Sequence, residues 1–245
     1  IGAISITKSP KLFGFNSTSG IELGEAEPSF AQTDAVRSSI GYGHSFTPLQ
    51  ISRYATTLAT KGTLYKYTLI DKITDKDGKV IKSLSPVVEN KITDFSTKAW
   101  NKITEGMENV ILKYSGTLRR AYENIPVIVA GKTGTTSDYN DVWFAGYTPY
   151  YTATVWTGYD NNVKLTAAAE KNLSKTLWRA VMSRIHEELP NKSFPMPNGI
   201  VSATVCSRSG KLPVPGLCDQ TLRSEYFAQG TVPSETCDIH YSGII

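Results

Sequence analysis

Residues 130–136 read Ala130-Gly131-Lys132-Thr133-Gly134-Thr135-Thr136 and directly follow the strand-forming run Val127-Ile128-Val129. Two further strand-like runs come next, at residues 142–147 and 151–159, and Thr148-Pro149-Tyr150 joins them as a tight connection. Three successive strands with short links predict an antiparallel sheet. The Lys-Thr-Gly segment is therefore expected to belong to the first strand of that sheet.

Helices are predicted both before and after the sheet residues along the chain. Thr47 suits an N-cap and Pro48 the first helical position, and the helical spacing continues to Lys61-Gly62. Ser96 can cap a second helix with an apolar face. Between these helices, β-branched residues around an Asp-Gly turn at residues 75–78 predict a hairpin.

A third helix is predicted at residues 173–189, after the sheet. Its apolar stripe is expected to pack on the sheet and contains Leu177, Trp178, Val181, Met182, Ile185 and Leu189. Prolines 190, 195 and 197 then form a linker. The predicted boundary lies between residues 1–190, which carry the sheet, and residues 191–245, a small cysteine-containing extension.

Composition and charge exclude several classes of protein. The chain has 245 residues, 40% hydrophobic, and 26 basic against 22 acidic residues give a formal charge of +4. This balance is too mild to indicate a nucleic-acid partner. The longest clean apolar run, residues 125–130, is far shorter than the roughly 18 to 20 residues that cross a bilayer. Because the chain starts at Ile1 without a signal peptide, we expect any membrane anchor upstream.

The Gly-Lys-Thr tripeptide allows a phosphate-binding loop as one interpretation. That motif requires a glycine five positions before Gly131, where this chain has Pro126. The intervening residues 127–130 form an apolar strand whose amides are committed to a sheet. Nucleotide binding is therefore disfavoured. An exposed edge-strand lysine beside a turn glycine is the plainer alternative for so short a motif.

Serine acyl transfer is the other functional interpretation of the segment. Lys132 supplies positive charge, and Thr133 and Thr135 supply hydroxyls, for a substrate carboxylate. Gly134 lets an acyl donor approach the strand closely, because no side chain stands in the way. The Thr135 amide can serve an oxyanion hole. A donor along this edge pairs as an added strand.

The wider sequence resembles the transpeptidase domain of penicillin-binding proteins. Residues 130–136 and 141–149 carry the resemblance, with Asp141-Val142-Trp143-Phe144-Ala145-Gly146-Tyr147-Thr148-Pro149 after the Lys-Thr-Gly strand. Upstream, residues 20–23 and 40–50 are similar to family segments that precede that strand. Residues 223–233 are similar to the tail of bifunctional, class A members. The resemblance extends from about residue 12 to residue 240.

The resemblance implies a serine D-Ala-D-Ala transpeptidase that cross-links peptidoglycan stem peptides and is acylated by β-lactams. It implies an antiparallel sheet sandwiched between helices, and a covalent acyl-enzyme formed without cofactor or metal. Lys132 is then the catalytic residue, and substrate contacts are assigned to Thr133, Gly134, Thr135 and Thr136. The implied location is the extracytoplasmic face of the bacterial cell membrane.

Two motifs of that family are missing or misplaced. The only Ser-x-x-Lys is Ser5-Ile6-Thr7-Lys8, where β-branched residues and Pro10 disfavour a helix. No Ser-x-Asn occurs in the chain. We expect a C-terminal portion of a transpeptidase, with its nucleophile in a missing N-terminal part, that does not acylate as given. A β-lactam sensor and a catalytically inactive cell-wall scaffold are the alternatives.

The remaining candidates are a loop histidine, several aromatic residues and the cysteines. His44 is expected to be structural rather than catalytic. Trp143, Tyr147, Trp156 and Tyr159 are expected to pack on the sheet rather than to form a ligand platform.

All three cysteines, Cys206, Cys218 and Cys237, lie in the last 40 residues. One disulfide among them is the favoured interpretation, and three free thiols come second. A zinc site with His240 is the least favoured, because no close Cys-x-x-Cys pair is present. We therefore expect no metal.

Overall fold

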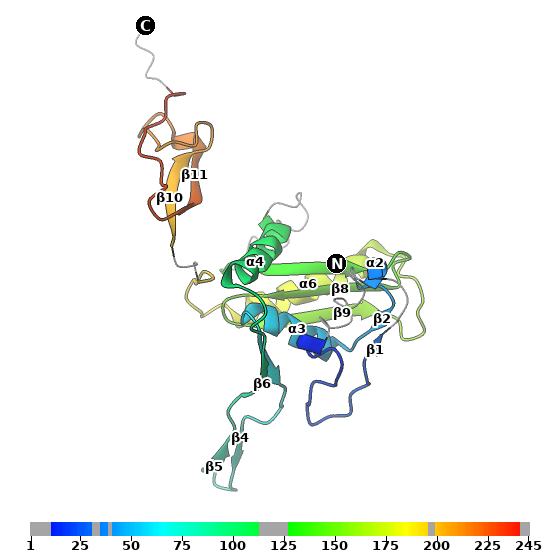
Figure 1. Ribbon diagram of the computed structural model, residues 1–245. Helices are drawn as coiled ribbons and strands as arrows, with labels where there is room; N and C mark the ends of the chain where they lie inside the picture. Colours follow the sequence, from blue (N-terminus) through cyan, green and yellow to red (C-terminus); the bar gives the residue numbers. More distant parts are fainter. Residues whose placement is uncertain (1–10, 31–34, 39–40, 113–126, 196–198, 241–245) are drawn as a thin grey trace. The chain divides into compact units, whose positions relative to one another are not determined.

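The computed structural model describes residues 11–30, 35–38, 41–112, 127–195 and 199–240 (Figure 1). The chain divides into two compact units, Ile1–Phe194 and Pro195–Ile245. Phe194 belongs to the first unit because its ring lies edge-on to Tyr147, with ring centroids 5.4 Å apart. The observed division therefore comes four residues after the boundary predicted at residue 190.

The first unit is organised around a three-stranded antiparallel sheet of order β7-β8-β9. Its strands are β7 (Ala130–Thr135), β8 (Asp141–Tyr147) and β9 (Thr152–Gly158). The predicted antiparallel sheet is confirmed. However, the first strand begins at Ala130 rather than at residue 127. It extends to Thr135 and therefore contains the whole Lys-Thr-Gly segment.

Helices cover both faces of this sheet (Figure 1). On one face, Phe144 of β8 packs edge-on against Trp178 of α6 (Ala168–Ile185), with ring centroids 5.0 Å apart. Tyr147, three positions later in β8, faces the opposite side. There it clusters with α3 (Pro48–Ala59) and α4 (Thr97–Leu112). The predicted sandwich is confirmed.

The first two predicted helices begin at the predicted caps. The Gln50 amide donates to the Thr47 hydroxyl at 3.2 Å, and the Gln50 side chain accepts from the Thr47 amide at 2.9 Å. This reciprocal pair is a capping box at the start of α3. At the start of α4, the Ser96 hydroxyl accepts from the Ala99 amide at 3.3 Å. Local sequence therefore sets both helix starts.

The prediction for the third helix is wrong in three respects. Helix α6 starts at Ala168, five residues before the predicted start, and there the Glu170 carboxylate accepts a hydrogen bond from the Ala167 amide at 2.9 Å. It ends at Ile185, four residues before the predicted end, so Leu189 lies beyond the helix. The apolar stripe is also only partly buried. Trp178 and Met182 have no exposed surface, whereas the neighbouring apolar row at positions 177, 181 and 185 is 43–52% exposed. Successive residues of a helix are rotated by about 100° around its axis. The row that contains residue 177 therefore points away from the sheet when the row that contains Trp178 faces it.

Smaller strand pairs complete the first unit. The predicted hairpin is confirmed as β4 (Lys72–Thr74) and β5 (Val80–Ser83), and β3 (Thr63–Lys66) pairs with β6 (Val87–Lys91). Three short elements precede α3: β1 (Ser29–Phe30), α2 (Ala35–Ser38) and β2 (His44–Ser45), with β1 antiparallel to β2.

The second unit contains one antiparallel pair, β10 (Ile200–Cys206) and β11 (Leu222–Ala228), with the short 3-10 helix η1 (Asp219–Thr221) before β11. Its buried cluster consists of Cys206, Cys218 and Cys237, with Val214 packed against them. All three cysteines are free, so the favoured disulfide is wrong. Across both units, the described helices are too short or too polar to cross a membrane.

Candidate functional site at the Lys-Thr-Gly strand

The Lys-Thr-Gly segment lies on an edge of the central sheet. In the described part of the chain, β7 pairs only with β8, from Ala130 opposite Tyr147 to Thr135 opposite Val142. The backbone groups on its other edge make no strand ladder there. An extended peptide can pair with such an edge through its main chain, and side-chain contacts then set the specificity.

Lys132 lies in the middle of β7 and is exposed to solvent. Its Nζ donates a hydrogen bond to the Thr133 carbonyl at 2.8 Å. Among the residues that the structure describes, no carboxylate forms an ion pair with this ammonium group. Its positive charge is therefore available to an anionic group beside the strand.

Two glycines on β7 lie close to aromatic side chains of β8. A Cβ at Gly131 would lie 2.5 Å from Phe144 Cζ, so any side chain there would displace the core. A Cβ at Gly134 would lie 3.2 Å from Trp143 Cβ. Gly131 thus lets the strand approach the core, and Gly134 keeps the strand surface clear beside the Trp143 ring.

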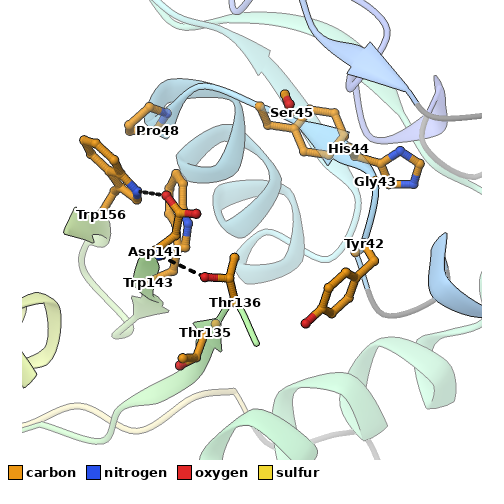
Figure 2. Close-up of a pocket in the computed structure, with 13 residues that line it drawn as sticks. Tyr42, Gly43, His44, Ser45, Pro48, Thr135, Thr136, Asp141, Trp143 and Trp156 are labelled. Atoms are coloured by element: carbon orange, nitrogen blue, oxygen red, sulfur yellow. Dashed lines mark hydrogen bonds between the residues drawn. The ribbon is translucent and has the colours of Figure 1, made fainter. Parts of the chain in front are cut away.

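A pocket of about 520 Å³ lies between the end of β7 and the segment that leads into α3 (Figure 2). Its lining comes from three places in the sequence: residues 41–46 with Pro48, residues 134–136, and Asp141, Trp143 and Trp156 on β8 and β9. Of the five predicted site residues, Gly134, Thr135 and Thr136 line this pocket. Lys132 and Thr133 precede them on β7 and do not line it.

Thr136 has a structural role in the pocket wall. Its hydroxyl accepts hydrogen bonds from the amides of Asn140 at 3.0 Å and Asp141 at 2.9 Å. The Asp141 carboxylate in turn accepts from the Trp156 indole at 2.9 Å (Figure 2). These bonds close the turn between β7 and β8 and tie it to β9. Thr136 thereby fixes the position of the residues around it.

Aromatic residues contribute more to the pocket than the sequence indicated. Trp143 and Trp156 both line it, with ring centroids 6.3 Å apart, while Tyr147 is fully buried in the core. Tyr159 instead donates to Glu170 at 2.9 Å. The prediction of sheet-face packing thus describes Tyr147 well but misses the position of the two tryptophans at the pocket.

Tyr42 and His44 also line the pocket, from a segment that is remote in sequence. The Tyr42 hydroxyl shares a hydrogen bond with the Ser137 hydroxyl, which joins positions 95 residues apart. The ring of His44 lies 5.9 Å from that of Phe46. The similarity of residues 40–50 to a segment of the penicillin-binding family could have indicated that they belong to the site. Nothing in these residues predicted that they contact the turn after β7.

A partly buried carboxylate anchors this remote wall. Glu25 accepts from the Thr47 hydroxyl at 2.7 Å, and from the amide and the hydroxyl of Ser19 at 2.6 and 2.7 Å. Burial by itself raises the pKa of Glu25, but the hydrogen bonds from Thr47 and Ser19 outweigh it and lower the pKa below its ordinary value. Glu25 therefore fixes the start of α3 as a carboxylate. Ser5, the unlikely nucleophile, lies outside the described residues.

Two family models match the chain, one for each unit. The model described as the penicillin binding protein transpeptidase domain matches residues 1–183. The model described as the penicillin-binding protein 1A, C-terminal domain, matches residues 196–242.

Curated relatives have the same family name. Penicillin-binding protein 1A of Clostridium tetani is 33% identical over an alignment of 188 residues, which covers 74% of this chain and 23% of that protein. Penicillin-binding protein 1A of Clostridium botulinum, strain Langeland, is 35% identical over an alignment of 208 residues, which covers 82% of this chain and 24% of that protein. The chain thus spans about a quarter of the length of these relatives.

Solved structures show the same fold. Penicillin-binding protein 1A from Haemophilus influenzae matches with a TM-score of 0.62 and 22% identity, over 96% of this chain and 38% of that one. The penicillin-binding protein PonA1 from Mycobacterium tuberculosis matches with a TM-score of 0.58 and 19% identity, over 80% and 56%. At these identities the likeness is one of fold.

Proposed function

The chain belongs to the penicillin-binding protein transpeptidase family, and from this premise we propose that its first unit forms one wall of a D-Ala-D-Ala transpeptidase site. The substrates are peptidoglycan stem peptides, which a serine acyl-enzyme cross-links. The observation that carries the proposal is the unpaired edge of β7 in the described chain, with an exposed Lys132 and no carboxylate paired to it.

The acyl donor lies along β7 as an added strand. Main-chain groups of β7 bind its backbone, and Gly134 allows close approach. Lys132 places a positive charge beside the terminal carboxylate, and the hydroxyls of Thr133 and Thr135 donate to that group. The Thr135 amide polarises the carbonyl that is attacked, because a donor aimed at the developing oxyanion stabilises the transition state. Thr136 and Asp141 hold the turn that follows.

The nucleophilic serine and its base come from outside these 245 residues. The only Ser-x-x-Lys in the chain begins at Ser5, and no Ser-x-Asn is present. The partner is thus an N-terminal part of the same protein, which also provides the anchor at the extracytoplasmic face of the membrane. β-Lactams acylate only the completed site, and neither a cofactor nor a metal takes part in the reaction.

The test is the intact mass of the longest natural form after incubation with a fluorescent penicillin. The wild-type protein should gain one adduct. Lys132→Ala should slow acylation by about 10²-fold or more, because general acid–base and charge effects of that size are lost. Thr135→Ala removes one hydrogen bond to a charged group, so a loss of roughly 10- to 100-fold is expected. Lys76→Ala is the matched control, because that side chain is 90% exposed in the β4–β5 turn.

The other outcomes separate the alternatives. An adduct on this chain alone would promote Ser5 or another of its serines and contradict an external nucleophile. A long form without any adduct supports the inactive scaffold. A long form that is acylated but does not cross-link a D-Ala-D-Ala peptide supports the β-lactam sensor.

A further inference from the structure

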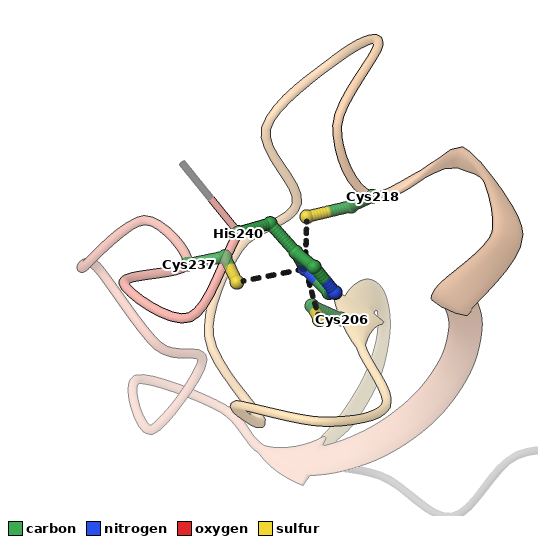
Figure 3. Close-up of side chains that lie close together, drawn as sticks. All are labelled: Cys206, Cys218, Cys237 and His240. Atoms are coloured by element: carbon green, nitrogen blue, oxygen red, sulfur yellow. Dashed lines mark hydrogen bonds between the residues drawn. The ribbon is translucent and has the colours of Figure 1, made fainter. Parts of the chain in front are cut away.

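Four side chains that can bind metal converge in the second unit. The ligand atoms of Cys206, Cys218, Cys237 and His240 all lie within 4.8 Å of one another (Figure 3). Cys206 ends β10, Cys218 precedes η1, and Cys237 and His240 lie near the end of the described chain. In Figure 3 the three sulfurs lie around one nitrogen of the His240 ring, where the dashed lines meet.

The sulfur-to-nitrogen distances are close to those of a tetrahedron around a single ion. His240 Nδ1 lies 3.5 Å from Cys206 Sγ and 3.3 Å from each of the other two sulfurs. With zinc bonds of about 2.3 Å to sulfur and about 2.0–2.1 Å to nitrogen, a tetrahedral S-to-N edge is roughly 3.6 Å. One nitrogen at nearly equal distance from three sulfurs is therefore the arrangement that a shared ion requires.

Neither thiol hydrogen bonds nor a disulfide accounts for this convergence. A neutral imidazole nitrogen has either one hydrogen or one lone pair, so Nδ1 can satisfy only one of its three sulfur neighbours. A disulfide would join two cysteines and leave the third thiol buried. Exposure of the cysteines is 0% for Cys206, 0% for Cys218 and 6% for Cys237.

The backbone around the cysteines fixes their positions. The Cys206 amide donates to the Lys211 carbonyl, and the Cys237 amide to the Leu212 carbonyl, both at 2.8 Å. Lys211 Nζ also binds Glu235 at 2.8 Å and Asp238 at 2.6 Å. The strand that carries Cys206 and the segment that carries Cys237 are thus joined through Lys211 and Leu212.

One amide donor is directed at the sulfur atoms, because the Val214 amide donates to Cys218 Sγ at 3.3 Å. The Thr221 hydroxyl lies 3.4 Å from Cys206 Sγ and donates its hydrogen to the Cys218 carbonyl at 2.9 Å. An outer donor such as the Val214 amide orients its ligand and disperses the charge of a metal-bound thiolate.

The second unit has a small hydrophobic core. Val214 packs against the three cysteines, and Val205 is the one further buried apolar residue among those described in this unit. Units of about this size commonly depend on disulfides, metals or other cross-links, since their hydrophobic cores are too small.

We propose that Cys206, Cys218, Cys237 and His240 bind one structural Zn²⁺ ion. All four tetrahedral positions come from the protein, which is the pattern of a structural rather than a catalytic zinc site. On binding, the thiols that are still protonated release their protons to solvent, and His240 Nδ1 gives its lone pair to the metal. This proposal replaces the expectation of no metal and does not depend on the proposed transpeptidase function.

The test is the metal content of the 245-residue chain, purified without a histidine tag. Mass spectrometry under native conditions and elemental analysis should both give one zinc per chain. After chelation, refolding with Co²⁺ should give the strong visible bands of a tetrahedral ion and thiolate-to-cobalt charge transfer in the near ultraviolet. These readouts use the unmodified chain and so do not depend on the folding of a variant.

Variants then identify the ligands. His240→Ala should weaken zinc binding by more than the roughly 10- to 100-fold that outer-sphere changes cause. His44→Ala is the matched control, since it removes a histidine of the first unit, and it should retain a full equivalent of zinc. The proposal is overturned by a metal-free chain with three reactive thiols, by a mass two hydrogens lighter from a disulfide, or by an octahedral cobalt spectrum.

Discussion

The two units of this chain are held by different kinds of core. In the first, Phe144, Trp178 and Met182 have no exposed surface and pack with further aliphatic residues between sheet and helix. In the second, the buried cluster consists of three cysteines. A sandwich can bury large side chains from two layers, whereas a single strand pair has no second layer to pack against. In the smaller unit the cysteine side chains that we propose as zinc ligands therefore form the interior, whereas large apolar side chains form it in the larger unit.

The largest effect is expected from metal removal. Structural zinc contributes about 10–16 kcal/mol of apparent folding free energy in zinc-finger peptides. Chelation of this chain under reducing conditions should abolish amide-exchange protection in β10 and β11 and leave protection in β7, β8 and β9 unchanged. Hydrogen exchange followed by mass spectrometry measures both sets of strands in one sample. Unchanged protection of β10 and β11 would contradict the prediction that the second unit, unlike the first, depends on a metal ion for its stability.

The next largest effect is expected in the apolar core. Trp178→Ala should lower the free energy of unfolding of the first unit by about 3–5 kcal/mol, because it leaves a cavity under Phe144. It also removes the indole hydrogen bond to the Ala153 carbonyl, 2.9 Å long. Urea denaturation monitored by exchange in β8 and β9 provides the measurement.

The control for this change is the preceding residue on α6. Leu177 is 45% exposed, so Leu177→Ala should change the free energy of unfolding by only about 0.5 kcal/mol. Neither variant should alter exchange in β10 and β11. Equal losses for the two variants would show that α6 packs through a different face from the one described here.

A smaller effect than that of Trp178→Ala is expected for Glu25→Gln, which tests the remote pocket wall. The pKa of Glu25 is lowered in the folded chain, so its stabilising contribution is present above the ordinary glutamate range near pH 4.3 and is lost as the pH falls through the lower folded value. The variant should therefore be about 1 kcal/mol less stable than wild type at pH 7. The difference should disappear in acid. A difference independent of pH would show that the charge of Glu25 does not hold the wall.

Local patterns predicted much of the first unit. Thr47 and Ser96 mark helix starts because a capping side chain bonds to amides only two or three positions away. The Asp-Gly turn at residues 75–78 predicted its hairpin for the same reason. Gly134 was assigned to the edge strand from the strand-forming residues and turns around it. In each case the evidence lies within a few residues of the feature.

Helix α6 shows where such patterns fail. Residues 177, 178, 181 and 182 are all apolar, yet of these four only Trp178 and Met182 are buried. Periodicity indicates that a helix has an apolar side but does not define which row meets the sheet. The contact between the Phe144 ring of the sheet and Trp178 determines which row of the helix faces the sheet.

The sequence by itself determined the three-stranded sheet, the capped helices and the position of Lys132 and Gly134 on its first strand, because these depend on neighbours along the chain. Only the tertiary structure decided that Tyr42 meets Ser137, 95 residues away, and that Cys206 meets His240, 34 residues away. No spacing rule predicts such contacts. They arise when strands and turns fold back and bring remote segments to the same point.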